Sequence, residues 1–155
     1  MPVGAGALRR PESRRAEPFW RALTRWDLPR LFSLSFGLVF VIVGLLGFLV
    51  TGFGSLLGST GILVFFALNP LHNLAHTLIG ALWLVSAART DTARSATQIF
   101  GSVYLLLAIL GFLQVGAALT ALGLNAADNI LHLVTGLAAL GVGFFASRTP
   151  DPLDA

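Results

Sequence analysis

The fold is decided by an uncharged stretch that runs from residue 31 to residue 88. It begins with LFSLSFGLVFVIVGLLGFLVT (31–51) and ends with NPLHNLAHTLIGALWLVSAA (69–88). One helical crossing of a bilayer needs about 20 predominantly apolar residues. The stretch therefore predicts two transmembrane helices, at 31–51 and 69–88. The connection, 52–68, is first rich in Gly and Ser, and its apolar end could form an interfacial or strand-like segment.

A second uncharged stretch follows the charged residues 89–94 and predicts a third transmembrane helix at 97–120. Asp128 then precedes a fourth helix at 129–147, and residues 148–155 form a polar tail. Backbone polar groups in lipid must be satisfied internally, and long runs without alternation indicate helices rather than barrel strands. We expect an all-α, integral membrane four-helix bundle at 31–147.

The composition supports a membrane protein. Of the 155 residues, 55% are hydrophobic and 11% are charged, whereas an ordinary soluble domain has about 25% charged residues. These values exclude a disordered chain, a nucleic-acid-binding domain and most soluble enzymes. The chain has no Cys, which excludes disulfides and thiolate metal sites.

The arginines predict the orientation in the membrane. All ten basic residues are Arg; they lie before the first predicted helix, between the second and third, and after the fourth. Four crossings would bring these three segments to one side, and cytoplasmic flanks carry the excess of basic residues. We expect a multi-pass protein of the plasma (inner) membrane with both termini in the cytoplasm.

The N-terminal segment divides into two predicted parts. Residues 1–17 are expected to be a disordered cytoplasmic N-terminus. Residues 18–30 place Trp20 and Trp26 on one helical face and Arg21 and Arg25 on another. This pattern is typical of a short amphipathic helix lying in the membrane interface.

The sequence contains an internal repeat. Residues 36–50 and 100–114 share paired Gly-Phe positions 64 residues apart, such as Gly47 and Gly111. The second and fourth predicted helices align 56 residues apart, and their shared positions are Asn69/Asn125, Asn73/Asn129, His76/His132, Gly80/Gly136 and Leu84/Leu140. We therefore expect two copies of a helical hairpin, related as parallel repeats by an axis along the membrane normal.

Each copy carries the polar pattern N-x-x-H-x-x-x-G within a predicted membrane helix. Asn69 precedes a proline and is predicted to cap its helix, with Asn125 as its counterpart. His76 and His132 lie roughly 10 Å along their helices by the 1.5 Å rise per residue, where capping cannot explain them. Ionisable groups at membrane depth face the bundle interior and find partners. We expect His76 and His132 to approach each other, with Asn73 and Asn129 beside them, and Gly80 and Gly136 to allow close helix packing.

Several interpretations of this cluster remain open. The first is a structural hydrogen-bonded network of Asn69, Asn73, His76, Asn125, Asn129 and His132. The second is a divalent metal site formed by His72, His76, Asp128 and His132, in which the residues follow i, i+4 spacing. Haem held between His76 and His132, or a path for protons or ions, are further alternatives.

The string N-P-L-H-N-L-A-H-T-L-I-G at residues 69–80, with D-N-I-L-H-L-V-T-G at 128–136, resembles a bacterial family of four-helix membrane proteins. That family is a domain of unknown function, common in actinobacteria. The resemblance covers about residues 27–147 and implies a small multi-pass plasma-membrane protein. It brings no activity, cofactor or catalytic residue.

No catalytic constellation is visible in the sequence. Ser and Thr residues are scattered without an adjacent acid–base set, and no Gly-rich phosphate loop follows a strand. We therefore predict a non-enzymatic structural or accessory membrane component without a cofactor. Its surroundings would be the lipid bilayer, and a second copy or another membrane protein could be its partner. The alternative is a small-molecule or ion conduit, or a metal or haem protein ligated by His.

Overall fold

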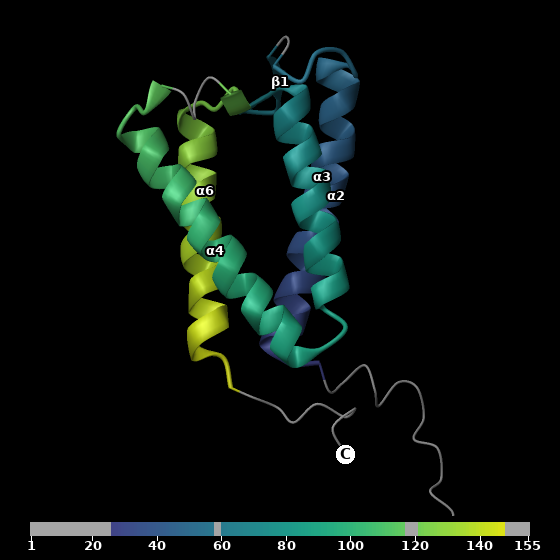
Figure 1. The fold of residues 1–155 in the computed structure, drawn as a ribbon, viewed down its shortest axis with the longest axis vertical. Coiled ribbons are helices and arrows are strands. Elements are labelled where there is room, and N and C mark those ends of the chain that lie inside the picture. The colour runs from purple at the N-terminus through teal and green to yellow at the C-terminus, as the bar shows by residue number, and fades with distance from the viewer. Residues whose placement is uncertain (1–25, 58–59, 117–120, 148–155) are drawn as a thin grey trace, which may run out of the picture.

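The structure is a computed structural model that describes residues 26–57, 60–116 and 121–147. The described residues are mostly helical, with four long helices and one short pair of strands (Figure 1). In chain order these elements are α2 (Leu28–Thr51), β1 (Gly61–Leu63), β2 (Phe66–Leu68), α3 (Pro70–Ser86), α4 (Thr90–Phe112) and α6 (Ala126–Phe145).

Helix α2 begins earlier than the sequence predicts. The side chain of Asp27 caps it by accepting a hydrogen bond from the backbone N–H of Arg30, and Pro29 stands in its first turn. Residues 28–30 therefore belong to α2 and not to an interfacial helix over 18–30. The rest of that predicted helix, apart from Trp26 and Asp27, lies outside the described residues, as do residues 1–17 and 148–155. At its other end α2 stops at Gly52, whose positive φ of 73° favours glycine.

Helix α4 differs most from its predicted range of 97–120. It begins at Thr90, because the charged residues assigned to a loop form its first turns, and Asp91 stands favourably near the positive end of the helix dipole. It ends at Phe112, and Gln114 adopts a positive φ of 58°. Helix α6 begins three residues before the predicted start, at Ala126, because Asn125 rather than Asp128 precedes it.

The helices form two antiparallel pairs. The first helix pair is α2 with α3, and the second helix pair is α4 with α6 (Figure 1). Glycines bring the backbones of each pair together: a Cβ at Gly80 would lie 2.8 Å from the carbonyl oxygen of Gly37, and one at Gly136 would lie 3.0 Å from that of Gly101. Such close contacts are typical of small residues at helix interfaces in membranes.

Residues 61–68 correct the all-α prediction. They form an antiparallel strand pair, in which Gly61 pairs with Leu68, Ile62 with Ala67 and Leu63 with Phe66. The turn between the strands includes Val64, with a positive φ of 60°. Of the two structures that the sequence left open for this segment, the strand-like one is observed. Ala67 and Leu68 are buried against the helices.

An aromatic core joins the two helix pairs. Trp83 of α3 is fully buried, its ring 5.3 Å from Phe100 and 6.2 Å from Tyr104 of α4 between centroids. Phe40 of α2 packs edge-on against Tyr104 at 5.3 Å. This core lies directly beside the polar residues described below.

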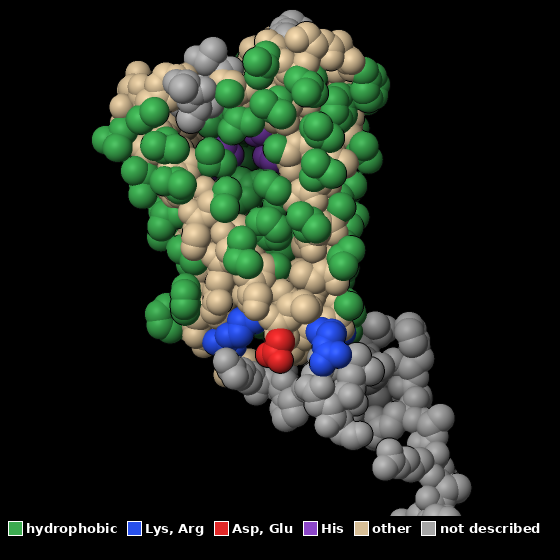
Figure 2. Space-filling view, in the orientation of Figure 1, with side chains coloured by type: hydrophobic (Ala, Val, Ile, Leu, Met, Phe, Trp, Pro, Cys, Tyr) green, Lys and Arg blue, Asp and Glu red, His purple; other side chains and the backbone are tan. Residues whose placement is uncertain are grey.

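The outer surface is that of a membrane protein. Large apolar side chains are exposed along the helices (Figure 2), among them Leu49 (78%), Val85 (73%) and Phe145 (88%), and surface of this kind needs an apolar surrounding. Among the described residues, α2, α4 and α6 are long and apolar enough to cross a membrane, while α3 has 17 residues and lies along α2. Figure 2 shows Arg and acidic side chains together at one end of the bundle.

Candidate functional site

The three histidines of the chain meet in one buried cluster between the helix pairs. His72 and His76 come from α3 and His132 comes from α6, with exposed fractions of 2%, 7% and 2%. One ligand atom from each lies within 4.8 Å of those of the other two. The Nε2 atoms of His72 and His76 are 3.1 Å apart. In Figure 2 histidine surface is visible in a hollow between apolar side chains, toward the end opposite the arginines.

Strand β2 fixes the orientation of His72. Its Nδ1 lies 3.2 Å from the carbonyl oxygen of Ala67. A carbonyl can only accept, so this contact favours the neutral tautomer with the proton on Nδ1, and Nε2 is the nitrogen that faces His76. The same peptide segment is held from the other side, because the backbone N–H of Ala67 donates to Oδ2 of Asp128 at 3.2 Å.

Asp128 does not join the histidine cluster. Its Oδ2 also accepts a hydrogen bond from the backbone N–H of Asn125 at 2.8 Å, which completes a capping box at the start of α6. Of the four candidate metal ligands found in the sequence, the structure thus gathers His72, His76 and His132. Asp128 is connected to the cluster through Ala67, whose N–H donates to Asp128 and whose carbonyl contacts His72.

Asn69 and Asn125 cap α3 and α6, as the sequence predicts. Oδ1 of Asn69 accepts from the backbone N–H of His72 at 2.8 Å, and Oδ1 of Asn125 accepts from that of Asp128 at 3.0 Å. The amide nitrogens make a second set of contacts between the helix pairs. Nδ2 of Asn69 donates to the carbonyl of Ala121, and Nδ2 of Asn125 donates to that of Phe65, both at 2.9 Å.

Asn73 and Asn129 pack against the neighbouring helix of their own pair. Each packs within its own helix pair, Asn73 over Gly47 of α2 and Asn129 over Gly111 of α4, so closely that a Cβ at either glycine would overlap the amide. Nδ2 of Asn73 donates to Oγ1 of Thr51 at 2.8 Å. The predicted network is therefore two sets: the histidines with the capping asparagines between the pairs, and Asn73 and Asn129 within them.

Aromatic rings close the inner side of the cluster. Phe40 packs on His76 and Tyr104 packs on His132, with ring centroids 4.9 and 5.1 Å apart. Nδ1 of His76 and Nδ1 of His132 are buried and have no hydrogen-bond partner among the described residues. Buried polar atoms are nearly always satisfied, so these two nitrogens are atoms that a further polar group or ion could engage.

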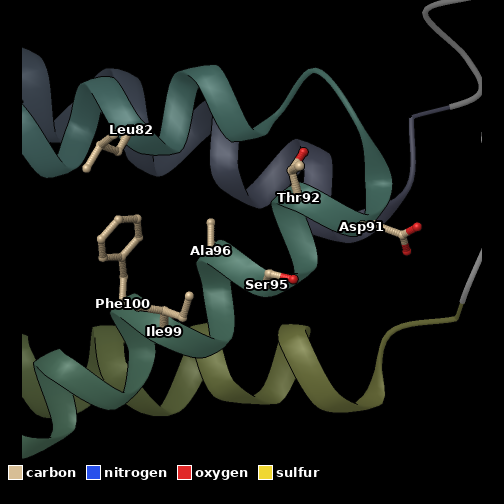
Figure 3. A pocket seen from close by; sticks show the side chains of 7 residues that line it. All are labelled: Leu82, Asp91, Thr92, Ser95, Ala96, Ile99 and Phe100. Carbon is tan, nitrogen blue, oxygen red and sulfur yellow. The ribbon is translucent and has the colours of Figure 1, made fainter.

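A second concavity, of about 390 Å³, lies between α3 and α4 near the arginine end (Figure 3). Leu82 and Phe100 face each other across it, and the Asp91 carboxylate points away from them. The hydroxyl of Thr92 donates to the carbonyls of Ser86 and Arg89 and so serves the local turn. This pocket presents an apolar lining and no set of groups that could bind an ion or perform acid–base chemistry.

Residues 30–145 match the family described as Domain of unknown function (DUF4383). The chain belongs to this family. The DUF4383 match spans the histidine cluster, both capping asparagines and the glycine contacts of both helix pairs. No curated protein and no solved structure matches the chain.

Two arginines of the DUF4383 domain have structural roles that the sequence analysis missed. Nε of Arg30 donates to the carbonyl of Ala87 at the end of α3, and the guanidinium of Arg94 donates to the carbonyls of Ala146 and Phe144 at the end of α6. Each therefore satisfies the last carbonyls of the partner helix. Arg30 and Arg94 are 64 residues apart, so extending the repeat alignment could have found them.

Proposed function

We propose that this chain is a non-enzymatic structural or accessory component of the plasma membrane, built from two duplicated helical hairpins. The observation that carries the proposal is the pair of reciprocal hydrogen bonds from Asn69 to Ala121 and from Asn125 to Phe65. These bonds link the helix pairs at the end opposite the arginines. Their function is to hold the two pairs together, which is what a rigid membrane scaffold needs.

The duplication is supported by contacts that recur at equivalent positions. The contacts between α2 and α3 have counterparts between α4 and α6 at offsets of 64 and 56 residues. These counterparts are Gly37–Gly80 and Gly101–Gly136, Gly47–Asn73 and Gly111–Asn129, and Phe40–His76 and Tyr104–His132. An unrelated pair of hairpins would not repeat the residue type and the contact together.

All four helices cross the membrane in this proposal. Helix α3 has 17 residues, which gives a length of about 26 Å at 1.5 Å per residue. It packs along the longer helix α2, and in this proposal the two helices cross the hydrocarbon region of the bilayer together. The arginine end is the cytoplasmic end, as the distribution of basic residues favours. Both termini are then cytoplasmic, and the strands and the histidine cluster lie toward the opposite face.

The absence of catalysis is proposed from the chemistry of the groups that are present. Among the described residues, the acid nearest the histidines is Asp128, and its carboxylate is engaged by two backbone N–H groups. Lipid is the principal partner, since apolar side chains cover the helices. The exposed apolar side chains also allow a second copy or another membrane protein to pack against the bundle.

Reporter fusions test the topology. A fusion after Ala88 should report a cytoplasmic location and a fusion after Ala121 an extracytoplasmic one. A cytoplasmic signal at Ala121 would contradict the four-crossing arrangement.

Flux measurements test the structural role against the alternative of a conduit. Liposomes containing the purified chain should show no proton or potassium flux above that of empty liposomes. Flux that disappears in His76→Ala or His132→Ala would replace the structural role by a conduit.

A further inference from the structure

We propose that His72, His76 and His132 bind one divalent transition-metal ion of the zinc class. The site goes beyond the structural role above and does not depend on it. It is formed by two helices of different pairs, so the ion would add a further link between the pairs.

The geometry of the three imidazoles carries the proposal. Their ligand atoms lie within 4.8 Å of one another, and the Nε2 atoms of His72 and His76 are 3.1 Å apart. Zinc–nitrogen distances of about 2.0–2.1 Å in a tetrahedral site require nitrogen atoms about 3.4 Å apart. Two of the ligands thus have nearly this spacing, and the third needs a shift of at most about 1.4 Å.

The surroundings of His72 also fit a metal ligand. Metal-ligating histidines usually donate their other ring N–H to a carbonyl or carboxylate. Nδ1 of His72 does so to Ala67, and Asp128 holds the N–H of Ala67 in turn. These two hydrogen bonds orient Nε2 of His72 as a ligand before any ion binds.

The chemistry of the donors selects the ion. Three neutral imidazoles without thiolate or carboxylate suit zinc, copper, nickel or cobalt, and do not suit calcium or magnesium, which prefer oxygen ligands. Three protein ligands leave a fourth position open, as in zinc sites that hold water or a small ligand. The close approach of His72 to His76 favours a single ion over the planar ring of haem.

The burial of the cluster explains why an ion is expected there. Three histidine rings lie together with two Nδ1 atoms that have no hydrogen-bond partner among the described residues. No hydrogen bond from the described part of the chain holds Nδ1 of His76 or of His132, so each of these rings has a nitrogen that an ion can engage. The rings of Phe40 and Tyr104 support His76 and His132 from the inner side and keep the ligands in place.

Cobalt(II) and zinc(II) titrations of the full chain test the proposal. The protein is purified in detergent with a tag that contains no histidine, and the three residues of the cluster are then its only histidines. We expect one cobalt ion per chain with the visible absorption of tetrahedral nitrogen ligation, displaced by one equivalent of zinc. This test needs only the wild-type chain. The proposal would be overturned if the cobalt absorption were absent, or if elemental analysis found no stoichiometric zinc after zinc addition.

Variants then assign the ligands. His72→Gln and His132→Gln should each lower cobalt affinity at least 10-fold, while Phe145→Leu, at an exposed position at the last residue of α6, should bind as the wild type does. Each variant is first required to elute as the wild type does on size exclusion, so that unfolded protein is not scored. Cobalt binding that survives in both folded histidine variants would overturn the site.

Discussion

Asn69 and Asn125 are linked by a reciprocal exchange: the side-chain amide of each donates to the carbonyl that lies four residues before the other. Ala121 accepts from Asn69 and Phe65 accepts from Asn125, both at 2.9 Å. Each asparagine at the same time caps its own helix. One side chain therefore sets where a helix begins and also how the two helix pairs meet.

Replacing either asparagine separates these two roles. Asn69→Ala or Asn125→Ala should lower the free energy of unfolding by about 1–3.5 kcal/mol, from a lost cap of about 0.5–2 kcal/mol and a lost hydrogen bond of about 0.5–1.5 kcal/mol. Asn69→Asp keeps the cap and removes the N–H donor, so it should fall between Asn69→Ala and the wild type. Thermal unfolding in detergent measures the order, and an Asp variant as stable as the wild type would show that the bond to Ala121 contributes nothing.

Glycines under the asparagine side chains give a second prediction. Gly47→Ala and Gly111→Ala would each force a Cβ into the amide of Asn73 or Asn129, and overpacking of this kind costs about 1–3 kcal/mol. Gly141→Ala is the matched control, because it lies in α6 with nothing within 4 Å of its Cβ position. It should be neutral or up to about 1 kcal/mol stabilising through helix propensity. Equal melting temperatures for the three variants would contradict the close packing.

The arginines at the charged end give a third prediction. Arg94→Ala should lower the melting temperature more than Arg30→Ala, because Arg94 donates to two carbonyls and Arg30 to one, at about 1 kcal/mol per bond. Arg94→Lys keeps the positive charge, on which the proposed topology rests, and loses the planar two-point contact. The Arg94→Lys variant should therefore insert with the wild-type orientation but have a lower melting temperature than the wild type. A reversed orientation in this variant would show that a positive charge at position 94 is not enough to set the orientation.

Trp83 provides the fourth prediction, since its ring is fully buried and its Nε1 has no hydrogen-bond partner among the described residues. Trp83→Phe removes this unpaired donor and retains an aromatic ring, so the free energy of unfolding should change by less than about 1.5 kcal/mol. Trp83→Ala should cost about 3–5 kcal/mol through the cavity it leaves. A Phe variant as unstable as the Ala variant would mean that Nε1 has a partner that stabilises the fold.

Much of the fold could be predicted because its determinants are local in the sequence. Uncharged runs of sufficient length identify membrane helices, and Asn69 followed by Pro70 identifies a helix start. The predicted start of α4 was wrong because charged residues such as Arg94 suggest a loop. At the end of a membrane bundle, charged side chains can instead extend from a helix into the polar region outside the lipid hydrocarbon. The strand pair is short, and three-residue strands give too little periodicity to distinguish them from other apolar segments.

The candidate site was only partly predictable for a different reason. The repeat placed His76 and His132 at equivalent depth, and helical spacing connected His72 to His76. The separation of Asp128 from the histidines depends on Ala67, which lies 61 residues away in sequence. An alanine carries no chemical signal, because its backbone alone makes the contacts.

The strand pair has a consequence for insertions and deletions. Successive side chains in a strand face opposite sides, so a one-residue slip reverses every one of them. If β2 slipped against β1, Phe66 or Leu68 would replace Ala67 between His72 and Asp128. Both contacts would then be lost together, and the bulky side chain would have to enter the space that Ala67 now occupies. The shortest element of the fold is therefore expected to tolerate a change of length least.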